Sequence, residues 1–328
     1  MSNSAVTVLY HADCPDGFGA AFAAWLRFGN QAAYRPMHHG QPWEMAEIAG
    51  HVVYILDFSF PPAQLETMAG IAASVIQIDH HASARQPWAS RLTKAADGRE
   101  SFDYSGLPLT VIFDLEKSGA RLAWEYFHPV RAVPLLVRHV EDIDLWRFAL
   151  PGTRAFSRSL RLRPFAFAVW DELMRRMPNA DSPEYQAFIA EGEAIERFFQ
   201  TEIARLAQSP LVMPARLRGE PLDPLQARRH GLPAISDGEH DWRAIDGLAI
   251  NASALFASEL ANRLAEQSNS FGLVWQLGAD GEAKVSLRAA GKVDVAETAT
   301  RYGGGGHPNA AGFRLPFARF ANEILGLL

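Results

Sequence analysis

Histidine and aspartate side chains follow three short apolar runs of this sequence, each at the point where a run ends. They are His11, Asp13 and Asp16 after "VTVLY", Asp57 at the end of "HVVYILD", and Asp79, His80 and His81 at the end of "SVIQIDHH". Carboxylates gathered in one place repel one another and lose hydration unless a cation neutralises them. If the three run ends lie together, these residues predict a metal site.

The types of these side chains indicate which ions they would take. Oxygen and imidazole ligands without thiolate favour Mn²⁺, with Mg²⁺, Fe²⁺, Co²⁺ or Zn²⁺ as substitutes. One ion does not need so many ligands, whereas two ions about 3.5–4 Å apart, sharing a carboxylate, would use them in phosphoryl transfer. Cys14 lies in the same turn. It is either a reactive thiol or an inert side chain, and the second is favoured when nothing activates it.

Single residues of this set have simpler interpretations. Asp13 and Asp16 are typical of an Asx turn or a helix N-cap before "GFGAAFAAW", and Asp57 is equally typical of a cap before "SFPPAQLE". A lone histidine pair is more often a surface feature than a metal ligand. Three successive runs that end on Asp or His favour the metal interpretation.

The elements around these residues predict how they meet. Short β-rich runs alternate with amphipathic stretches through the first half of the chain, as in "VTVLY", "FGAAFAAWLRFG", "HVVYILD", "PAQLETMAGIAA" and "SVIQID". This alternation is typical of an α/β fold with a mainly parallel sheet covered by helices. The functional crevice of such a sheet lies at the carboxyl ends of its strands.

The rest of the chain indicates further parts. The stretch "PLLVRHVEDIDLWRF" and the segment 182–207 have helical spacing. Residues 209–242 are rich in Pro, Gly and Arg, and they predict an irregular linker or insertion. Strand and helix patterns resume with "IDGLAIN", "ASALFASELANRLAEQ", "FGLVWQL", "KVSLRA", "VDVAETATRY" and "AGFRL", which predict a second, smaller α/β domain.

Composition excludes several classes of function. The chain has 328 residues, 48% of them hydrophobic, and a formal net charge of -6, which argues against a protein that coats duplex nucleic acid. A single cysteine excludes an internal disulfide framework and fits a cytoplasmic protein. No signal-peptide pattern and no apolar run near 20 residues is found, so we expect neither export nor a membrane partner.

Two motifs far apart in the chain resemble one family. "DHH", together with the aspartate-rich turn and Asp57, resembles the DHH phosphoesterase superfamily, and "GGGGHPNAAGF" after "SLRA" and "VDVAETATRY" is similar to the signature of the DHHA1 domain. The resemblance implies an oligoribonuclease-like fold in three parts. These are an N-terminal DHH catalytic domain over 1–164, a helical connector and irregular linker over 165–240, and a C-terminal DHHA1 substrate-binding domain over 241–328.

The resemblance also implies a hydrolase with two Mn²⁺ ions, for which Mg²⁺ or Co²⁺ would substitute. Asp57 would bridge the ions and His81 would act on substrate as a catalytic residue. Relatives often carry a further aspartate where this sequence has Phe18, and the hypothesis is that Asp13 replaces it. The "VEDIDLW" motif offers two candidates, and spacing does not choose between them. The implied metal ligands are His11, Asp13, Asp16, Asp57 and His80, with Asp142 or Asp144.

The glycine run predicts a binding segment. Glycines let backbone amides face an anion, and His307 follows immediately; without "DHH", a simple turn would be the favoured interpretation. Arg288 is a candidate phosphate clamp because a guanidinium presents a fork of donors. The predicted substrate-binding residues are Arg288, Gly304, Gly305, Gly306 and His307.

These patterns together predict a phosphodiesterase or phosphatase acting on short single-stranded oligonucleotides or small nucleotides. One alternative is a pyrophosphatase or exopolyphosphatase, which would need more Lys and Arg near the metals. Another is a catalytically silent nucleotide-binding regulatory module, which would lack strand-end ligands.

Overall fold

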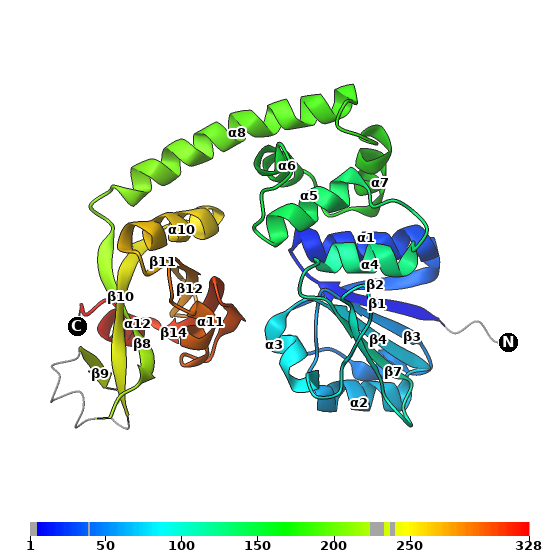
Figure 1. The fold of residues 1–328 in the computed structure, drawn as a ribbon, viewed down its shortest axis with the longest axis horizontal. Coiled ribbons are helices and arrows are strands. Elements are labelled where there is room, and N and C mark those ends of the chain that lie inside the picture. Colours follow the sequence, from blue (N-terminus) through cyan, green and yellow to red (C-terminus); the bar gives the residue numbers. More distant parts are fainter. Residues whose placement is uncertain (1–4, 39, 224–232, 237–239, 328) are drawn as a thin grey trace. The chain divides into compact units, whose positions relative to one another are not determined.

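The chain forms two compact units. The computed structural model describes residues 5–38, 40–223, 233–236 and 240–327. The units are Met1–Glu196 and Arg197–Leu328, and the helix α8 (Pro183–Ala207) contains the boundary between them (Figure 1). The domain limits at 164 and 240 remain predictions from the sequence.

The first unit is built on a mainly parallel sheet with strand order β2-β1-β3-β4-β7-β6-β5. The pairs β2/β1, β1/β3, β3/β4 and β4/β7 are parallel, and the short β6 and β5 add antiparallel pairs at one edge. The strands are β1 Val6–His11, β2 Ala32–Met37, β3 Val52–Leu56, β4 Ser74–Asp79, β5 Thr93–Lys94, β6 Glu100–Asp103 and β7 Leu109–Phe113.

This order contains a topological switch point. The chain leaves β1 for β2 on one side, and β3 then lies on the other side of β1. In an open α/β sheet the crevice between two such strands, outside their carboxyl ends, is where ligands bind. We therefore expect a ligand-binding site at the carboxyl ends of β1 and β3.

Both faces of the first sheet are buried. Val8 and Leu56 belong to one apolar cluster, whereas Leu9 and Ile55 belong to the cluster on the opposite face, as the two-residue period of strands requires. Helices α1 and α4 cover one face and α2 covers the other (Figure 1). The α-helices of this unit before α8 are α1 Pro15–Phe28, α2 Pro62–Ile71, α3 Ala82–Arg85, α4 Gly119–Phe127, α5 Leu135–Asp144, α6 Thr153–Leu160 and α7 Phe167–Arg176.

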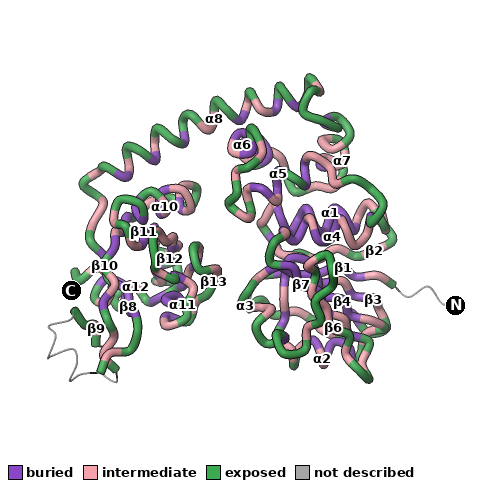
Figure 2. The backbone as a smooth tube through the Cα atoms, in the orientation of Figure 1, coloured by how far each residue is buried: buried purple, intermediate pink, exposed green. Residues whose placement is uncertain are grey.

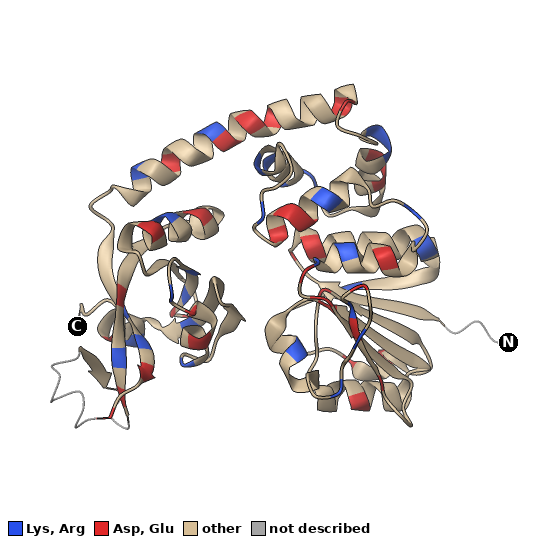
Figure 3. Ribbon diagram, in the orientation of Figure 1, with Lys and Arg blue, Asp and Glu red and all other residues tan. Residues whose placement is uncertain are grey.

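Burial differs strongly between helices. The alanine-rich α1 is buried along most of its length, because small side chains let it pack closely against α4 (Figure 2). Gly19 contributes to this close approach, since a Cβ there would lie 2.8 Å from the Ala120 Cβ. In contrast, α8 is largely exposed, and acidic and basic residues occur along it (Figure 3). Short 3₁₀ turns lie at Gly29–Gln31, Met45–Ile48, Gln86–Trp88 and Ala254–Phe256.

The second unit has its own mixed sheet with strand order β13-β14-β12-β11-β10-β8, and β9 also pairs with β10. Phe271, Leu273, Leu287 and Phe320 are fully buried in its core. The elements are β8 Met213–Pro221, β9 Ala234–Ser236, β10 Asp241–Asn251, α10 Ala257–Ser268, β11 Phe271–Leu277, β12 Glu282–Ala289, α11 Val295–Thr300, β13 Gly305–His307, β14 Ala310–Pro316 and α12 Phe317–Glu323. The α/β prediction is thus confirmed for both units.

The prediction of an irregular linker over 209–242 is wrong for residues 213–221. They form β8, which pairs antiparallel with β10 and sets Leu217 opposite Ile245. Ala215 and Leu217 are buried on one face, but the Pro, Arg and Gly residues around them hide this short alternation in the sequence. The segments 224–232 and 237–239 of the predicted linker lie outside the described residues.

Within the described part of the chain, every helix is too short or too polar to cross a lipid bilayer.

Candidate metal centre

The strand ends of the first sheet bring histidine and aspartate side chains together. His11 is the last residue of β1 and Asp57 directly follows β3. The His11 Nδ1 lies 3.5 Å from the Asp57 Oδ2. Asp57 adopts a left-handed backbone conformation with φ of 51°, which costs energy in a non-glycine residue and is found preferentially at functional sites. The two residues meet at the switch point of the sheet.

His80 stands at the centre of the arrangement. Its Nε2 lies 3.2 Å from the Asp57 Oδ1, 3.6 Å from the Asp16 Oδ2 and 3.6 Å from the Asp144 Oδ2. The three carboxylates come from α1, from the loop after β3 and from the end of α5. A single N–H group does not satisfy three carboxylates, so the cluster calls for a further positive charge.

Backbone amides fix the orientation of Asp16. The carboxylate accepts hydrogen bonds from the amides of Gly119 (2.6 Å) and Ala120 (3.0 Å) at the start of α4. Gly119 also allows Asp57 to lie close, because a Cβ at this position would lie 2.7 Å from the Asp57 Oδ1. The start of α4 therefore positions two of the candidate ligands.

Asp79 has a positioning role that the sequence did not assign to it. Its Oδ1 lies 2.7 Å from the His81 Nδ1 and accepts from the His80 amide at 2.7 Å, while its Oδ2 accepts from the Ser59 hydroxyl at 2.5 Å. The "DHH" triplet was the available signal, since a carboxylate beside a functional histidine commonly fixes the orientation of its ring.

The structure distinguishes the two aspartates of the "VEDIDLW" motif, Asp142 and Asp144, by their contacts. Asp144 lies in the cluster around His80. Asp142 instead accepts hydrogen bonds from the amides of Ala149 and Leu150 and from the Thr153 hydroxyl. Asp142 therefore stabilises the loop between α5 and α6, and its carboxylate oxygens are used there.

Asp13 lies at the edge of the arrangement. Its side chain is 86% exposed and its Oδ2 lies 3.6 Å from the His38 Nε2. Among the described residues, the groups with metal-binding spacing include Asp16 and do not include Asp13. The structure thus brings together His11, Asp16, Asp57, His80 and Asp144.

Burial and charge perturb the acid–base properties of this cluster. Burial opposes the ionised form of Asp57, but the neighbouring His11 and His80 hold its pKa below the usual range. Burial also opposes protonation of His80, yet the surrounding carboxylates raise its pKa to about 10. The pKa of Asp16 is raised well above its usual value by burial and by Asp144 and Asp57. Burial likewise raises the pKa of Asp144, to about 6.

The donor set fits divalent metal ions. Among the residues that the structure describes, three groups have ligand atoms within 4.8 Å of one another: Asp57 with Asp79, His80 and His81; His11 with Cys14 and Asp57; and Asp16 with His80 and Asp144. Asp57 occurs in two of these groups, as expected of a carboxylate shared by two ions. Its buried Oδ1 makes no hydrogen bond of ordinary geometry among the described residues, although His80 is near. A cation would complete the environment of this oxygen.

The residues predicted to bind substrate lie in the second unit. Arg288 is on β12, and its guanidinium donates to the Ser258 hydroxyl at 2.7 Å and to the Leu287 carbonyl at 2.8 Å. Gly305, Gly306 and His307 form β13, which pairs with β14. Gly306 has φ of 145°, and a Cβ at Gly304 would overlap the backbone of Gly312. Two of these glycines therefore have structural reasons to be glycine.

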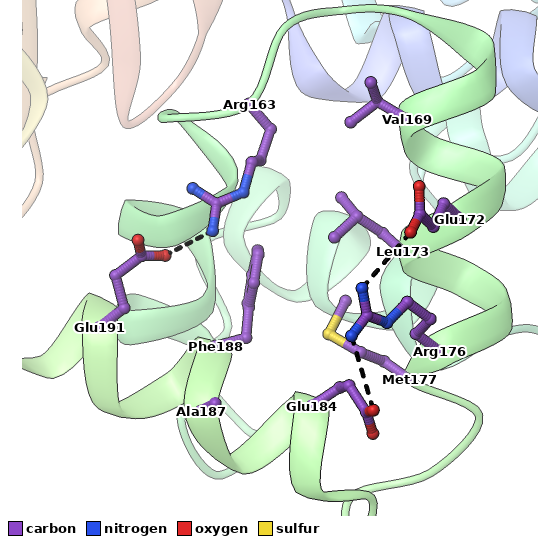
Figure 4. A pocket seen from close by; sticks show the side chains of 10 residues that line it. All are labelled: Arg163, Val169, Glu172, Leu173, Arg176, Met177, Glu184, Ala187, Phe188 and Glu191. Atoms are coloured by element: carbon purple, nitrogen blue, oxygen red, sulfur yellow. Dashed lines mark hydrogen bonds and ion pairs between the residues drawn. The ribbon is translucent and has the colours of Figure 1, made fainter.

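A pocket of about 380 Å³ lies between α7 and α8 in the first unit (Figure 4). Its apolar wall includes Leu173 and Phe188. Arg163 pairs with Glu191 at its rim at 2.8 Å (Figure 4). No predicted site residue lines this pocket.

Comparison with known proteins gives one curated relative and several solved structures. The chain is 27% identical over 324 residues to an uncharacterized protein of Acanthamoeba polyphaga mimivirus, covering 93% of this chain and 66% of that relative. The chain thus spans just under two thirds of the length of this relative.

The solved structures include RecJ of Thermus thermophilus in complex with Mn²⁺, with 17% identity and a TM-score of 0.45. That alignment covers 96% of this chain and 50% of RecJ. Another is the pGpG-specific phosphodiesterase PggH of Vibrio cholerae, with 12% identity and a TM-score of 0.43, covering 96% of this chain and 94% of PggH.

The C-terminal unit has a family assignment of its own. Residues 248–328 match the family model described as the DHHA1 domain. The matched range includes Arg288, the glycine run and His307, which carried the resemblance in the sequence. Residues 248–328 are therefore similar to the DHHA1 domain, as the glycine-rich motif predicted.

Proposed function

We propose that this protein is a divalent-metal-dependent phosphohydrolase that cleaves phosphodiester or phosphomonoester bonds of short oligonucleotides or small nucleotides. One observation carries the proposal: the His80 Nε2 lies within 3.6 Å of carboxylates from three separate elements. This arrangement supports a site for two cations at the place where α/β sheets bind ligands. The DHHA1 domain supports the same class of enzyme.

The site residues divide into metal ligands and a catalytic residue. His11, Asp16, Asp57, His80 and Asp144 would hold the ions, with Asp57 shared between them. Bound there, two divalent ions would activate water and offset the charge that develops on the phosphoryl group. We infer Mn²⁺ as the ion to test first, with Mg²⁺ or Co²⁺ as substitutes, because the set is dominated by oxygen and imidazole.

His81 is the proposed catalytic residue next to the ions. Asp79 fixes its Nδ1, which leaves Nε2 as the atom through which the ring would meet substrate. Burial opposes protonation of His81, but the Asp79 carboxylate raises its pKa. A ring whose protonated form is favoured by a neighbouring carboxylate is suited to stabilise a phosphoryl oxygen or to protonate the leaving oxygen.

The substrate class rests on the second unit and on charge. A DHHA1 domain with Arg288 and His307 supports recognition of a nucleotide, and the net charge of -6 favours a small substrate over a long duplex. A cytoplasmic place of action, suggested by the single cysteine, is part of the same proposal.

The test is hydrolysis by the metal-stripped full chain with and without Mn²⁺. The substrates are an RNA dinucleotide, a linear dinucleotide from a cyclic precursor, 3′-phosphoadenosine phosphate, an aryl phosphodiester, pyrophosphate and polyphosphate. Asp57→Asn is compared with Asp97→Asn, a matched change at a carboxylate that is 57% exposed. We expect Mn²⁺-dependent turnover of a nucleotide substrate that Asp57→Asn abolishes and Asp97→Asn retains.

Two outcomes would contradict the proposal. Turnover of pyrophosphate or polyphosphate alone would favour the pyrophosphatase alternative. Calorimetric binding of Mn²⁺ and nucleotide without turnover of any substrate would favour a silent regulatory module.

A further inference from the structure

Cys14 lies beside two candidate metal ligands. The ligand atoms of His11, Cys14 and Asp57 are all within 4.8 Å of one another. His11 ends β1, Cys14 precedes α1 and Asp57 follows β3. The three residues therefore converge from separate elements at the switch point of the first sheet, and Cys14 is the only cysteine of the chain.

The local backbone holds Cys14 in this place. Cys14 is the N-cap of α1 with an extended backbone, and its side chain makes no capping hydrogen bond. Pro15 starts the helix with a fixed φ, and a Cβ at Gly17 would overlap the His11 carbonyl oxygen. The turn from β1 into α1 is thus folded tightly against His11.

A second observation points to a cation at Asp57, which this cluster shares with the group around His80. Asp57 is 2% exposed, and its Oδ1 makes no hydrogen bond of ordinary geometry among the described residues. Its two oxygens face in different directions, since Oδ2 is 3.5 Å from the His11 Nδ1 and Oδ1 is 3.2 Å from the His80 Nε2. A buried carboxylate with this environment is stabilised by a nearby positive ion.

We propose that Cys14 supplies a thiolate ligand to the ion held by His11 and Asp57, an inference that rests on the proposed function. The thiol proton passes to solvent as the sulfur–metal bond forms. With metal–sulfur and metal–nitrogen bonds of about 2.3 and 2.1 Å, two ligands of one ion lie up to about 4.4 Å apart. The ligand atoms of His11, Cys14 and Asp57 all lie within 4.8 Å of one another, a limit close to this span.

This ligand changes which ion the position selects. Imidazole, carboxylate and thiolate together suit a borderline ion such as Zn²⁺, Co²⁺ or Fe²⁺ better than Mn²⁺ or Mg²⁺. The position around Asp16, His80 and Asp144 has no sulfur in its group and keeps the preference for harder ions. The two positions of one centre would therefore differ in metal preference.

The experiment uses Co²⁺ as a spectroscopic probe in the metal-stripped full chain. We expect a thiolate-to-cobalt charge-transfer band in the near ultraviolet for the parent, and its loss in both Cys14→Ser and Cys14→Ala. Visible cobalt bands should remain in the variants, because the other ligands still bind. Ser90→Ala, at an exposed position outside the cluster, is the control for unrelated spectral change.

Thiol reactivity provides a second readout. Because the chain has one cysteine, a thiol reagent reports on Cys14 alone. We expect Zn²⁺ to slow its modification at least tenfold in the folded protein, and the ratio of Zn²⁺ to Mn²⁺ affinity to fall at least tenfold in a folded Cys14→Ser variant.

The outcomes separate this inference from the proposed function. Visible cobalt bands without a charge-transfer band in the parent, or modification unaffected by Zn²⁺, would overturn the role of Cys14 and leave the two-ion site intact. Failure of the parent to bind Co²⁺, Zn²⁺ and Mn²⁺ would overturn both.

Discussion

The Nδ1 atom of His81 lies 2.7 Å from the Oδ1 atom of Asp79, and the same oxygen accepts from the backbone amides of His80 and His81. Asp79 is 1% exposed, so this carboxylate fixes both histidines from inside the sheet. Burial opposes its ionised form, but His81 lowers its pKa. One buried carboxylate therefore sets the ring of one histidine and the backbone of the other.

The first prediction concerns the positioning role of Asp79. Asp79→Asn keeps the size of the side chain but removes the charge that orients His81, and we expect kcat to fall about 10- to 100-fold with metal content retained. The acidic limb of the pH–rate profile should move as the His81 ring loses its carboxylate partner. Asp103→Asn, at the exposed last residue of β6, is the control and should behave as the parent. An unchanged rate and pH profile would show that Asp79 has no positioning role.

The second prediction separates the two histidines of "DHH". His80 faces three carboxylates, whereas His81 is paired with Asp79. We expect His80→Asn to lose bound metal and activity, and His81→Asn to retain metal but turn over slowly. Metal content is measured after desalting, and kcat is measured on a dinucleotide. Equal metal content in the two variants would contradict this division.

The third prediction tests the close approach of α4 to the centre. A Cβ at Gly119 would lie 2.7 Å from the Asp57 Oδ1, so Gly119→Ala forces Asp57 or α4 to move. We expect a loss of about 1–3 kcal/mol in the free energy of unfolding, together with weaker metal binding.

Gly70→Ala is the matched control for this change. Gly70 lies within α2 and a Cβ there would meet no atom within 4 Å, so alanine should leave metal binding unchanged and stabilise the helix by up to about 1 kcal/mol. If Gly119→Ala behaves like Gly70→Ala, the tight packing inferred at Asp57 is wrong.

The fourth prediction concerns stability at acidic pH. His139 is buried, its Nδ1 lies 2.8 Å from the Thr153 hydroxyl and its Nε2 lies 2.9 Å from the Tyr185 hydroxyl. Burial lowers its pKa to about 4. Between the ordinary histidine pKa and this value, the unfolded chain binds a proton that the folded protein does not bind. Stability from this group is therefore complete above the ordinary pKa and falls as the pH decreases toward about 4.

Urea unfolding in the presence of a chelator measures this effect. The parent should lose up to about 3 kcal/mol between pH 7 and pH 4 through His139, and His139→Gln should show a shallower decline. Other acidic groups titrate in both proteins, so the difference between the two curves isolates His139. Parallel curves would mean that its pKa is not lowered.

The sequence could predict the convergence of His11, Asp57 and His80 because parallel strands end at one edge of a sheet. It could not choose between Asp142 and Asp144, because residues two apart on a helix point to different sides and only tertiary packing decides which side faces the site. For Asp79 the "DHH" triplet gave a signal, but only the orientation of the His81 ring shows which atoms the carboxylate contacts.

The strands also differ in how well the local sequence predicts them. The runs that became β1, β3 and β4 have strong local patterns, whereas β8 is stabilised by pairing with β10 farther along the chain. Only Ala215 and Leu217 alternate with polar residues in β8, and prolines and arginines surround them. This pattern is too short to predict a strand from the local sequence.

The last prediction tests whether the DHHA1 domain recognises substrate. Arg288 and His307 carry donors that suit a phosphate or ribose, and they belong to the second unit, whereas the candidate metal ligands belong to the first. If they bind the distal part of a nucleotide, Arg288→Ala and His307→Ala should lower kcat/KM on a dinucleotide, chiefly through KM, and leave metal content unchanged.

An aryl phosphodiester lacks that distal group, so its hydrolysis should change much less, as expected when remote binding energy positions the reacting centre. Arg314→Ala, on β14 with a side chain that is 59% exposed, controls for the loss of one positive charge from the same domain. Ser258→Ala removes the hydroxyl that accepts from Arg288 and should produce a smaller defect of the same kind. Equal losses on both substrates, or no loss on the dinucleotide, would mean that these residues support the fold of the domain rather than substrate binding.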